Sequence, residues 1–162
     1  MDLGKFINDK AEYGYYLPFK GNQKYLKIFS KPIFEFWLHP KHPLTFEMPD
    51  GTKIRPDRHL AETDMGSTPR SLQLFFPSSE FICSYIFHDS AYNHHGLYFK
   101  HPNAHQYIFR KMTRKDVDKL CLCRMIRVEG GGPIKQRLIY RMVRMFGGAP
   151  WKKGKHPDTL NC

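Results

Sequence analysis

The sequence has 162 residues, a formal net charge of +11, 41% hydrophobic residues and 15% aromatic residues. This length is typical of one domain, and the apolar content is sufficient for a buried core, which excludes a wholly disordered chain. No apolar run approaches the roughly 18 residues that cross a bilayer, which excludes an integral membrane protein. The first residues have no basic region followed by a long apolar core, so we expect no classical secretory signal. The four cysteines form no C-x-x-C pair, so we expect either free thiols in a reducing compartment or residues of the core.

The first third of the chain favours β-strands. Residues 1–43 are rich in aromatic residues interrupted by glycine and proline, and we expect them to form an N-terminal arm or extra strands outside the main domain. Residues 44–48 and 52–55 flank Pro49-Asp50-Gly51, where proline presets one dihedral and glycine allows a positive φ. These two segments therefore predict a β-hairpin.

The last two thirds favour helices. Ser78 or Ser79 would cap a helix that ends near Gly96, and Thr113 would cap a second helix that continues through Met125. Pro133 suits the first position of a third helix. The apolar residues of that helix recur at helical spacing and predict a single stripe that faces the core: Ile134, Leu138, Met142 and Met145. Strands followed by helices predict an α+β fold.

Three segments have side chains that suit acid–base or metal chemistry: Thr63-Asp64, His88-Asp89-x-x-Tyr92 and Asp118. His88 has an ordinary pKa near neutrality and would hold a water molecule as a general base. Asp118, on a later antiparallel helix, would accept the other ring N–H of His88 and fix its tautomer. Asp89 would ligate a hard cation through its carboxylate, together with Asp64 and backbone carbonyls near Gly66 in a preceding loop.

Each of these residues also has a plain structural interpretation. Asp64 is more simply interpreted as a turn or cap residue. Tyr92, one helical turn after His88, is more simply interpreted as a packed aromatic with one hydroxyl partner. Asp118 would then be a solvated carboxylate on a helix surface, paired with a neighbouring basic residue. We expect a ring nitrogen of His88 to lie within hydrogen-bond reach of Asp118 or Tyr92 in either interpretation.

Four motifs occur in order along the chain. They are Thr63-Asp64-Met65-Gly66-Ser67-Thr68-Pro69-Arg70, His88-Asp89-x-x-Tyr92, Val117-Asp118-x-x-Cys121 and Tyr140-Arg141-x-Val143-Arg144-x-Phe146-Gly147. This series resembles an uncharacterised domain family common in tailed bacteriophages and prophages. The likeness covers about residues 44–151 and leaves the basic tail, 152–162, outside. It departs from the family pattern at Gly66, where alanine is usual, and at Cys121, where phenylalanine is usual. The resemblance implies a phage or prophage origin.

A second resemblance concerns chemistry. The His88-Asp89-x-x-Tyr92 motif followed by Asp118 is similar to the secreted calcium-dependent phospholipase family. That likeness implies that His88 activates water as the catalytic base and that Asp118 and Tyr92 support it. It also implies that Asp89 binds calcium beside a loop that contains Asp64 and Gly66. The chain departs from this family because it lacks the bracing disulfides and most of the glycine-rich calcium loop.

These observations leave three functional hypotheses. The first is a bacteriophage virion component of the tail or baseplate, or an assembly component, that contacts other phage structural proteins in the virion or the host cytoplasm. Residues 1–40 and the segment from Trp151 would then make few contacts with their own domain. The second is a phospholipase-like hydrolase that acts on an anionic membrane surface at cell entry or lysis. The third is a nucleic-acid-binding or host-defence-countering protein, which the basic charge favours although no known nucleic-acid-binding motif is present.

Overall fold

The computed structural model describes residues 2–7, 14–16, 34–37, 44–57, 61–63 and 81–154. Residues 14–16, 34–37 and 61–63 are described by their backbone alone. Asp64, Gly66 and the serines expected to cap a helix, Ser78 and Ser79, lie outside the described residues, as does most of the Thr63–Arg70 motif.

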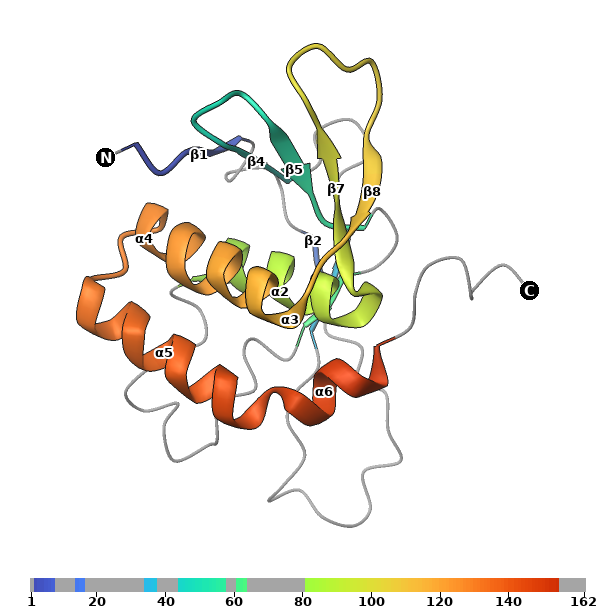
Figure 1. Ribbon diagram of the computed structural model, residues 1–162. Helices are drawn as coiled ribbons and strands as arrows, with labels where there is room; N and C mark the ends of the chain where they lie inside the picture. The colour runs from blue at the N-terminus through green and yellow to red at the C-terminus, as the bar shows by residue number, and fades with distance from the viewer. Residues whose placement is uncertain are drawn as a thin grey trace.

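Eight strands of the described residues form two antiparallel sheets. The larger sheet has the order β1-β4-β5-β7-β8 (Figure 1) and contains β1 (Lys5–Ile7), β4 (Thr45–Glu47), β5 (Lys53–Arg55), β7 (Gly96–Lys100) and β8 (Ile108–Lys111). The smaller sheet has the order β2-β3-β6 and contains β2 (Gly14–Tyr16), β3 (Phe34–Trp37) and β6 (Ala61–Thr63). Helices follow in the C-terminal half, so the predicted α+β class is confirmed.

The predicted hairpin is β4–β5. Gly51 has a φ of +78°, and its N–H donates to the carbonyl of Met48 at 2.9 Å. The Asp50 carboxylate accepts the N–H of Thr52 at 2.9 Å, which closes the turn from the other side. The turn therefore forms for the local reasons that its sequence indicates.

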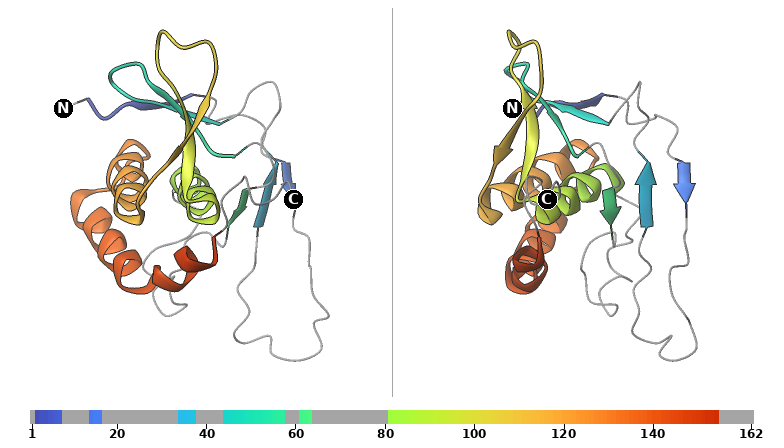
Figure 2. Two further views of the ribbon diagram at one scale, coloured as in Figure 1. Left: turned by 45° about the vertical axis from the view of Figure 1, so that its right-hand side comes forward. Right: turned by 90° about the vertical axis from the view of Figure 1, so that its right-hand side faces the viewer.

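The helices form two layers beneath the larger sheet (Figures 1 and 2). Their bounds are α2 (Ile82–His94), α3 (Arg114–Asp118), the π-helix η1 (Lys119–Met125), α4 (Ile126–Val128), α5 (Pro133–Phe146) and α6 (Gly148–Lys153). The middle layer holds α2 and the continuous α3-η1-α4 segment, and the outer layer holds α5 and α6. Within the described part of the chain, no helix has the length and apolar content to cross a membrane.

Two hydrophobic clusters separate these layers. The first lies between the sheet and the middle layer and includes Phe46, Ile54, Phe87, Leu97 and Val117. The second lies between the middle layer and α5 and includes Phe81, Tyr85, Leu122, Ile126, Ile139 and Met142. The α2 helix contributes to both clusters, so it is the central element of the described fold.

The predicted core stripe of α5 is wrong. Ile134, Leu138 and Met145 are 83%, 44% and 69% exposed, and of the four predicted residues only Met142 is buried. Ile139, which the stripe did not include, packs into the second cluster instead. The helix therefore packs on a face rotated from the predicted one, and it leaves apolar side chains on its outer surface.

The ends of α2 are set by groups that the sequence pattern did not indicate. The N-cap residue is Phe81, which makes no side-chain cap, and the Glu129 carboxylate accepts the N–H groups of Cys83 and Ser84 at 3.0 and 2.9 Å. At the other end His95, with a φ of +58°, takes the left-handed conformation. The residue we expected to end the helix, Gly96, begins β7.

Gly96 also allows β7 to pair closely with β8. A Cβ on Gly96 would collide with the carbonyl oxygen of Arg110 on β8, so this close pairing requires glycine.

Parts of both terminal segments belong to the fold, contrary to the expectation of few contacts. Phe6 on β1 packs edge-on against Phe46, with ring centroids 5.1 Å apart. Trp151 on α6 lies 4.5 Å from the ring of His95 and 5.0 Å from that of Tyr92. The side chains of β3, which include Phe34, Phe36 and Trp37, lie outside what the structure describes.

Thr113 is the N-cap of α3, as predicted, and its removal should have a moderate cost. Its hydroxyl oxygen accepts the N–H of Asp116 at 3.2 Å. We expect Thr113→Ala to lower the free energy of unfolding by about 1 kcal/mol, because one N–H of the first turn loses its partner. Urea denaturation measures this loss, and Thr113→Ser should restore most of it. Equal stability of the alanine variant and the unmodified chain would contradict the capping role.

Candidate functional site

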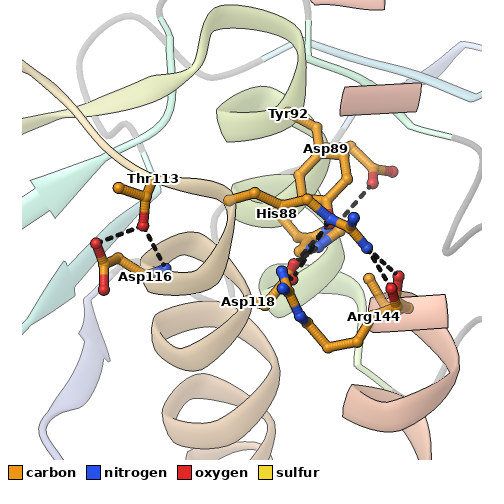
Figure 3. A network of polar contacts seen from close by, with 9 residues as sticks. His88, Asp89, Tyr92, Thr113, Asp116, Asp118 and Arg144 are labelled. Atoms are coloured by element: carbon orange, nitrogen blue, oxygen red, sulfur yellow. Dashed lines mark hydrogen bonds and ion pairs between the residues drawn. The ribbon is translucent and has the colours of Figure 1, made fainter. Parts of the chain in front are cut away.

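The structure brings His88, Tyr92 and Asp118 together, as predicted (Figure 3). His88 and Tyr92 lie four residues apart on α2 and therefore share one helix face, which is turned toward the end of α3. The Nε2 atom of His88 lies 3.0 Å from Oδ1 of Asp118, and the Tyr92 hydroxyl donates to the same oxygen at 2.7 Å. Asp118 is completely buried and the other two side chains are 5% exposed. The interpretation of Asp118 as a solvated carboxylate is therefore wrong.

Two arginines complete this network, and sequence reasoning missed the part that they play. Arg144 on α5 donates to Oδ2 of Asp118 at 2.9 Å, so both carboxylate oxygens are engaged (Figure 3). Arg114 donates from Nε to the Tyr92 hydroxyl at 3.1 Å and from Nη2 to the carbonyls of Val143 and Arg144 at 2.8 and 2.7 Å. The network therefore joins α2, α3 and α5. We call His88, Tyr92, Arg114, Asp118 and Arg144 the interhelix network.

The second ring nitrogen of His88 also faces a carboxylate. Its Nδ1 atom lies 3.3 Å from Oδ1 of Asp89, the next residue on α2. Burial disfavours the charged ring, but the hydrogen bonds to Asp118 and Asp89 outweigh it and raise the pKa of His88 above its usual range. When both ring nitrogens carry a proton and donate it, the ring holds no lone pair that could accept one. A ring protonated at both nitrogens would be a cation between two carboxylates.

The other titratable groups of the site fit a fixed network of charges. Burial raises the pKa of Asp118, but the hydrogen bonds from His88, Tyr92 and Arg144 outweigh it and hold this pKa below its usual value. Burial and the hydrogen bond to Asp118 raise the pKa of the Tyr92 hydroxyl, which therefore stays protonated. Burial also raises the pKa of the nearby Cys121 thiol well above its usual range. Cys121 is therefore unsuited to act as a nucleophile.

The described residues do not provide a calcium site. No group of three or more histidine, cysteine, aspartate or glutamate side chains suited to a metal ion occurs among them. Of the three expected metal-binding residues, the structure describes only Asp89, whose carboxylate faces His88. Calcium prefers six to eight oxygen ligands, and one carboxylate does not supply them.

A close backbone approach holds α5 beside this network. A Cβ on Gly147, at the end of α5, would lie 2.9 Å from the Tyr92 hydroxyl and 2.7 Å from the Val143 carbonyl oxygen. Glycine therefore allows the chain to pass directly over Tyr92.

Comparisons of the chain with protein-family models, with curated proteins and with solved structures find no match.

Proposed function

We propose that the protein is a bacteriophage protein that serves as a component of the virion, in the tail or baseplate, or of its assembly. It contacts its partner proteins through the outer face of α5. The observation that carries this proposal is the group of exposed large apolar side chains on that helix, Ile134, Leu138, Met145 and Phe146. Contiguous exposed apolar surface is uncommon on monomers and is typical of interaction sites.

Three of these residues form a stripe along α5. Ile134, Leu138 and Met145 are separated by four and seven residues, so they lie within one narrow sector of the helix. This spacing is the one by which a helix contacts another helix or a groove. Arg137 and Arg141, both exposed, lie along one side of the same stripe. We call these five residues the outer stripe.

The interhelix network supports this role because it fixes the opposite side of α5. Arg144 is bonded to the buried Asp118, and Arg114 holds the last carbonyls of the helix. A docking helix that is already rigid loses less conformational entropy when a partner binds. In this proposal His88, Asp118 and Tyr92 are positioning residues of the fold.

The charge of this layer indicates the chemistry of the partner. Residues 133–153 contain six basic residues and no acidic residue: Lys135, Arg137, Arg141, Arg144, Lys152 and Lys153. One of these charges, that of Arg144, is balanced internally by Asp118. A second copy of the chain would bring like charges together, whereas a phage structural protein with acidic side chains around an apolar patch would complement the surface.

A hydrolase is the second candidate, and one contact favours it. The hydrogen bond from Nε2 of His88 to Asp118 would fix the ring as in a general base whose Nδ1 faces the reacting water. This function requires the Asp89 carboxylate to move away from Nδ1, and it requires a substrate opening beside a side chain that is 5% exposed. As a structural link between the helices, the interhelix network requires neither the movement of Asp89 nor an opening beside His88. We therefore favour the structural role.

Incorporation into particles tests the first candidate. We expect the chain to be found by mass spectrometry in purified particles, or in stable assembly intermediates, of the phage or prophage that encodes it. Leu138→Glu should reduce its incorporation at least about tenfold, because a buried carboxylate at an interface costs more than ~1.4 kcal/mol. Ile108→Glu is the matched control, because Ile108 is equally apolar and 64% exposed but lies on β8.

Two results would contradict the proposal. Absence of the unmodified chain from both particles and assembly intermediates would exclude a structural role in the virion. Equal incorporation of the Leu138→Glu variant and the Ile108→Glu control would exclude α5 as the docking element. Circular dichroism and thermal melting of both variants establish that a loss of incorporation is not a loss of folding.

A further inference from the structure

The outer face of the larger sheet carries two rows of side chains defined by the strand register. Cross-strand partners lie on the same face, and successive residues of a strand alternate between faces. The first row crosses four strands and contains Lys5, Glu47, Lys53 and Lys100. The second row crosses three strands and contains Arg55, Tyr98 and Phe109.

Both rows face away from the helices. The row between them contains Phe46 and Ile54, which are completely buried in the cluster beneath the sheet. The residues on either side of Ile54 in β5, Lys53 and Arg55, therefore point to the opposite face. Figure 1 shows this sheet and the outer helix layer of α5 and α6 at opposite ends of the described fold.

The second row offers aromatic rings held in a fixed arrangement. The rings of Tyr98 and Phe109 pack edge to face with centroids 5.3 Å apart, and both side chains are partly exposed. The Arg55 guanidinium lies 4.2 Å from the ring centroid of Tyr107, and its Nε donates to Thr45 at 2.9 Å. Rings held in this way need little further ordering when a flat group stacks on them.

The first row makes this face basic. Lys5 and Lys53 are 70% and 45% exposed, and Lys100 continues the row onto β7. Glu47 is the one carboxylate in the two rows, at 3.5 Å from Lys5 and 3.8 Å from Lys53. Three lysines and one arginine against one glutamate leave the face with a net positive charge.

We propose that this face binds single-stranded nucleic acid. The lysine row would contact the phosphate backbone, and Tyr98 and Phe109 would present ring faces to unstacked bases. In a duplex the bases are already stacked, so a platform of partly exposed rings adds affinity mainly for single strands. This inference uses a different surface from the outer stripe of α5, so it goes beyond the proposed function and does not depend on it.

Fluorescence anisotropy with the full chain tests this inference. The probes are fluorescein-labelled single-stranded RNA, single-stranded DNA and duplex DNA of mixed sequence, each about 20 nucleotides long to exceed the site of one domain. We expect at least one of the single strands to bind about tenfold more tightly than the duplex. Comparison of the RNA and DNA probes identifies which of the two the face prefers.

Two substitutions at one position separate ring stacking from general charge. Phe109→Leu keeps an apolar side chain on β8 but removes the aromatic ring, and it should weaken single-strand binding about tenfold. Phe109→Tyr keeps the ring and should bind within about threefold of the unmodified chain. Thermal melting of both variants checks that they are folded.

Salt dependence tests the lysine row. The double variant Lys53→Gln and Lys100→Gln should reduce the slope of log affinity against log salt by about 1.4, since each single-strand phosphate contact contributes about 0.7. The control is the double variant Arg137→Gln and Arg141→Gln, which removes the same charge from α5 and should leave the slope unchanged.

Two results would overturn the inference. One is equal binding of single strands and duplex that Phe109→Leu does not weaken, because general basic charge would then explain it. The other is that none of the three probes binds at low salt. This result would overturn the inference even if the chain bound vesicles that contain anionic lipid. Neither result bears on incorporation into particles, which depends on α5.

Discussion

Asp118→Asn is expected to lower the free energy of unfolding by about 3–5 kcal/mol, the cost of removing one partner from a buried ion pair. The carboxylate is completely buried and accepts hydrogen bonds from His88, Tyr92 and Arg144. Asparagine keeps the shape of the side chain but leaves the His88 cation buried without its main counter-charge. For a chain of this size the loss corresponds to a fall in melting temperature on the order of 10 °C.

Asp116→Asn is the matched control for this experiment. Asp116 lies on the same helix, two residues before Asp118, and its carboxylate accepts an exposed hydrogen bond from Thr113. We expect its replacement to change stability by less than about 1 kcal/mol, because exposed polar contacts contribute little. Calorimetry or urea denaturation compares the two variants. If Asp118→Asn were as stable as this control, the interhelix network would not hold the helices together.

Stability is expected to fall as the pH rises from below 6.5 through the raised pKa of His88. A histidine whose pKa is higher in the folded than in the unfolded protein contributes its full stabilisation when the pH is below its pKa in the unfolded protein. This contribution is lost as the ring deprotonates in the folded protein. The groups that favour the charged ring are Asp118 and Asp89, on α3 and α2. At acid pH, Asp118 affects stability in the opposite direction because its pKa is lowered by folding. The stability that its ionised carboxylate contributes is complete above pH 3.8 and is lost as the pH falls through the lowered pKa.

His88→Asn isolates this effect from the other histidines. The variant should be less stable than the unmodified chain below pH 6.5, and the gap should narrow as the pH rises through the folded pKa of His88. Urea denaturation at a series of pH values gives both curves. A gap that stays constant over the whole range would mean that folding leaves the pKa of His88 unchanged, and a gap that widens as the pH rises would mean that the folded ring is held neutral.

Local sequence patterns were sufficient for several elements of the fold. The Pro49-Asp50-Gly51 turn, the Thr113 cap and Pro133 at the first position of α5 each depend on residues within one turn of the chain. These three features could be predicted because few distant contacts decide them. Helical spacing also places His88 and Tyr92 on one face of α2, but the approach of Asp118 was expected only from an assumed antiparallel helix pair.

Other features depend on distant contacts that no local pattern contains. Glu129 reaches α2 across more than forty residues, and nothing in its surroundings in the sequence marks it as a cap. Arg144 is one of several basic residues on α5, and only the packing of that helix selects it as the partner of Asp118. The apolar residues of α5 define a wide arc, and the spacing does not show which side of the arc faces the core.

The wrong prediction of a core stripe on α5 bears on the proposed function, because the exposed apolar residues of this helix are those that the stripe placed in the core. Ile134, Leu138 and Met145 fit the pattern of a core stripe, yet they are exposed while Ile139 is buried. An interface between proteins resembles a core in its apolar spacing, so a sequence pattern cannot distinguish the two. The residues that contradict the predicted core are therefore those that we assign to the partner.

The protonation state of the His88 ring tests most directly whether the interhelix network is structural. Nitrogen-15 chemical shifts of the imidazole ring, assigned with the His88→Asn variant, distinguish a ring with two N–H groups from one with a free nitrogen lone pair. Near neutral pH we predict that both Nδ1 and Nε2 carry protons, because they face Asp89 and Asp118. A neutral ring with an unprotonated Nδ1 would contradict this account and would favour His88 as a general base.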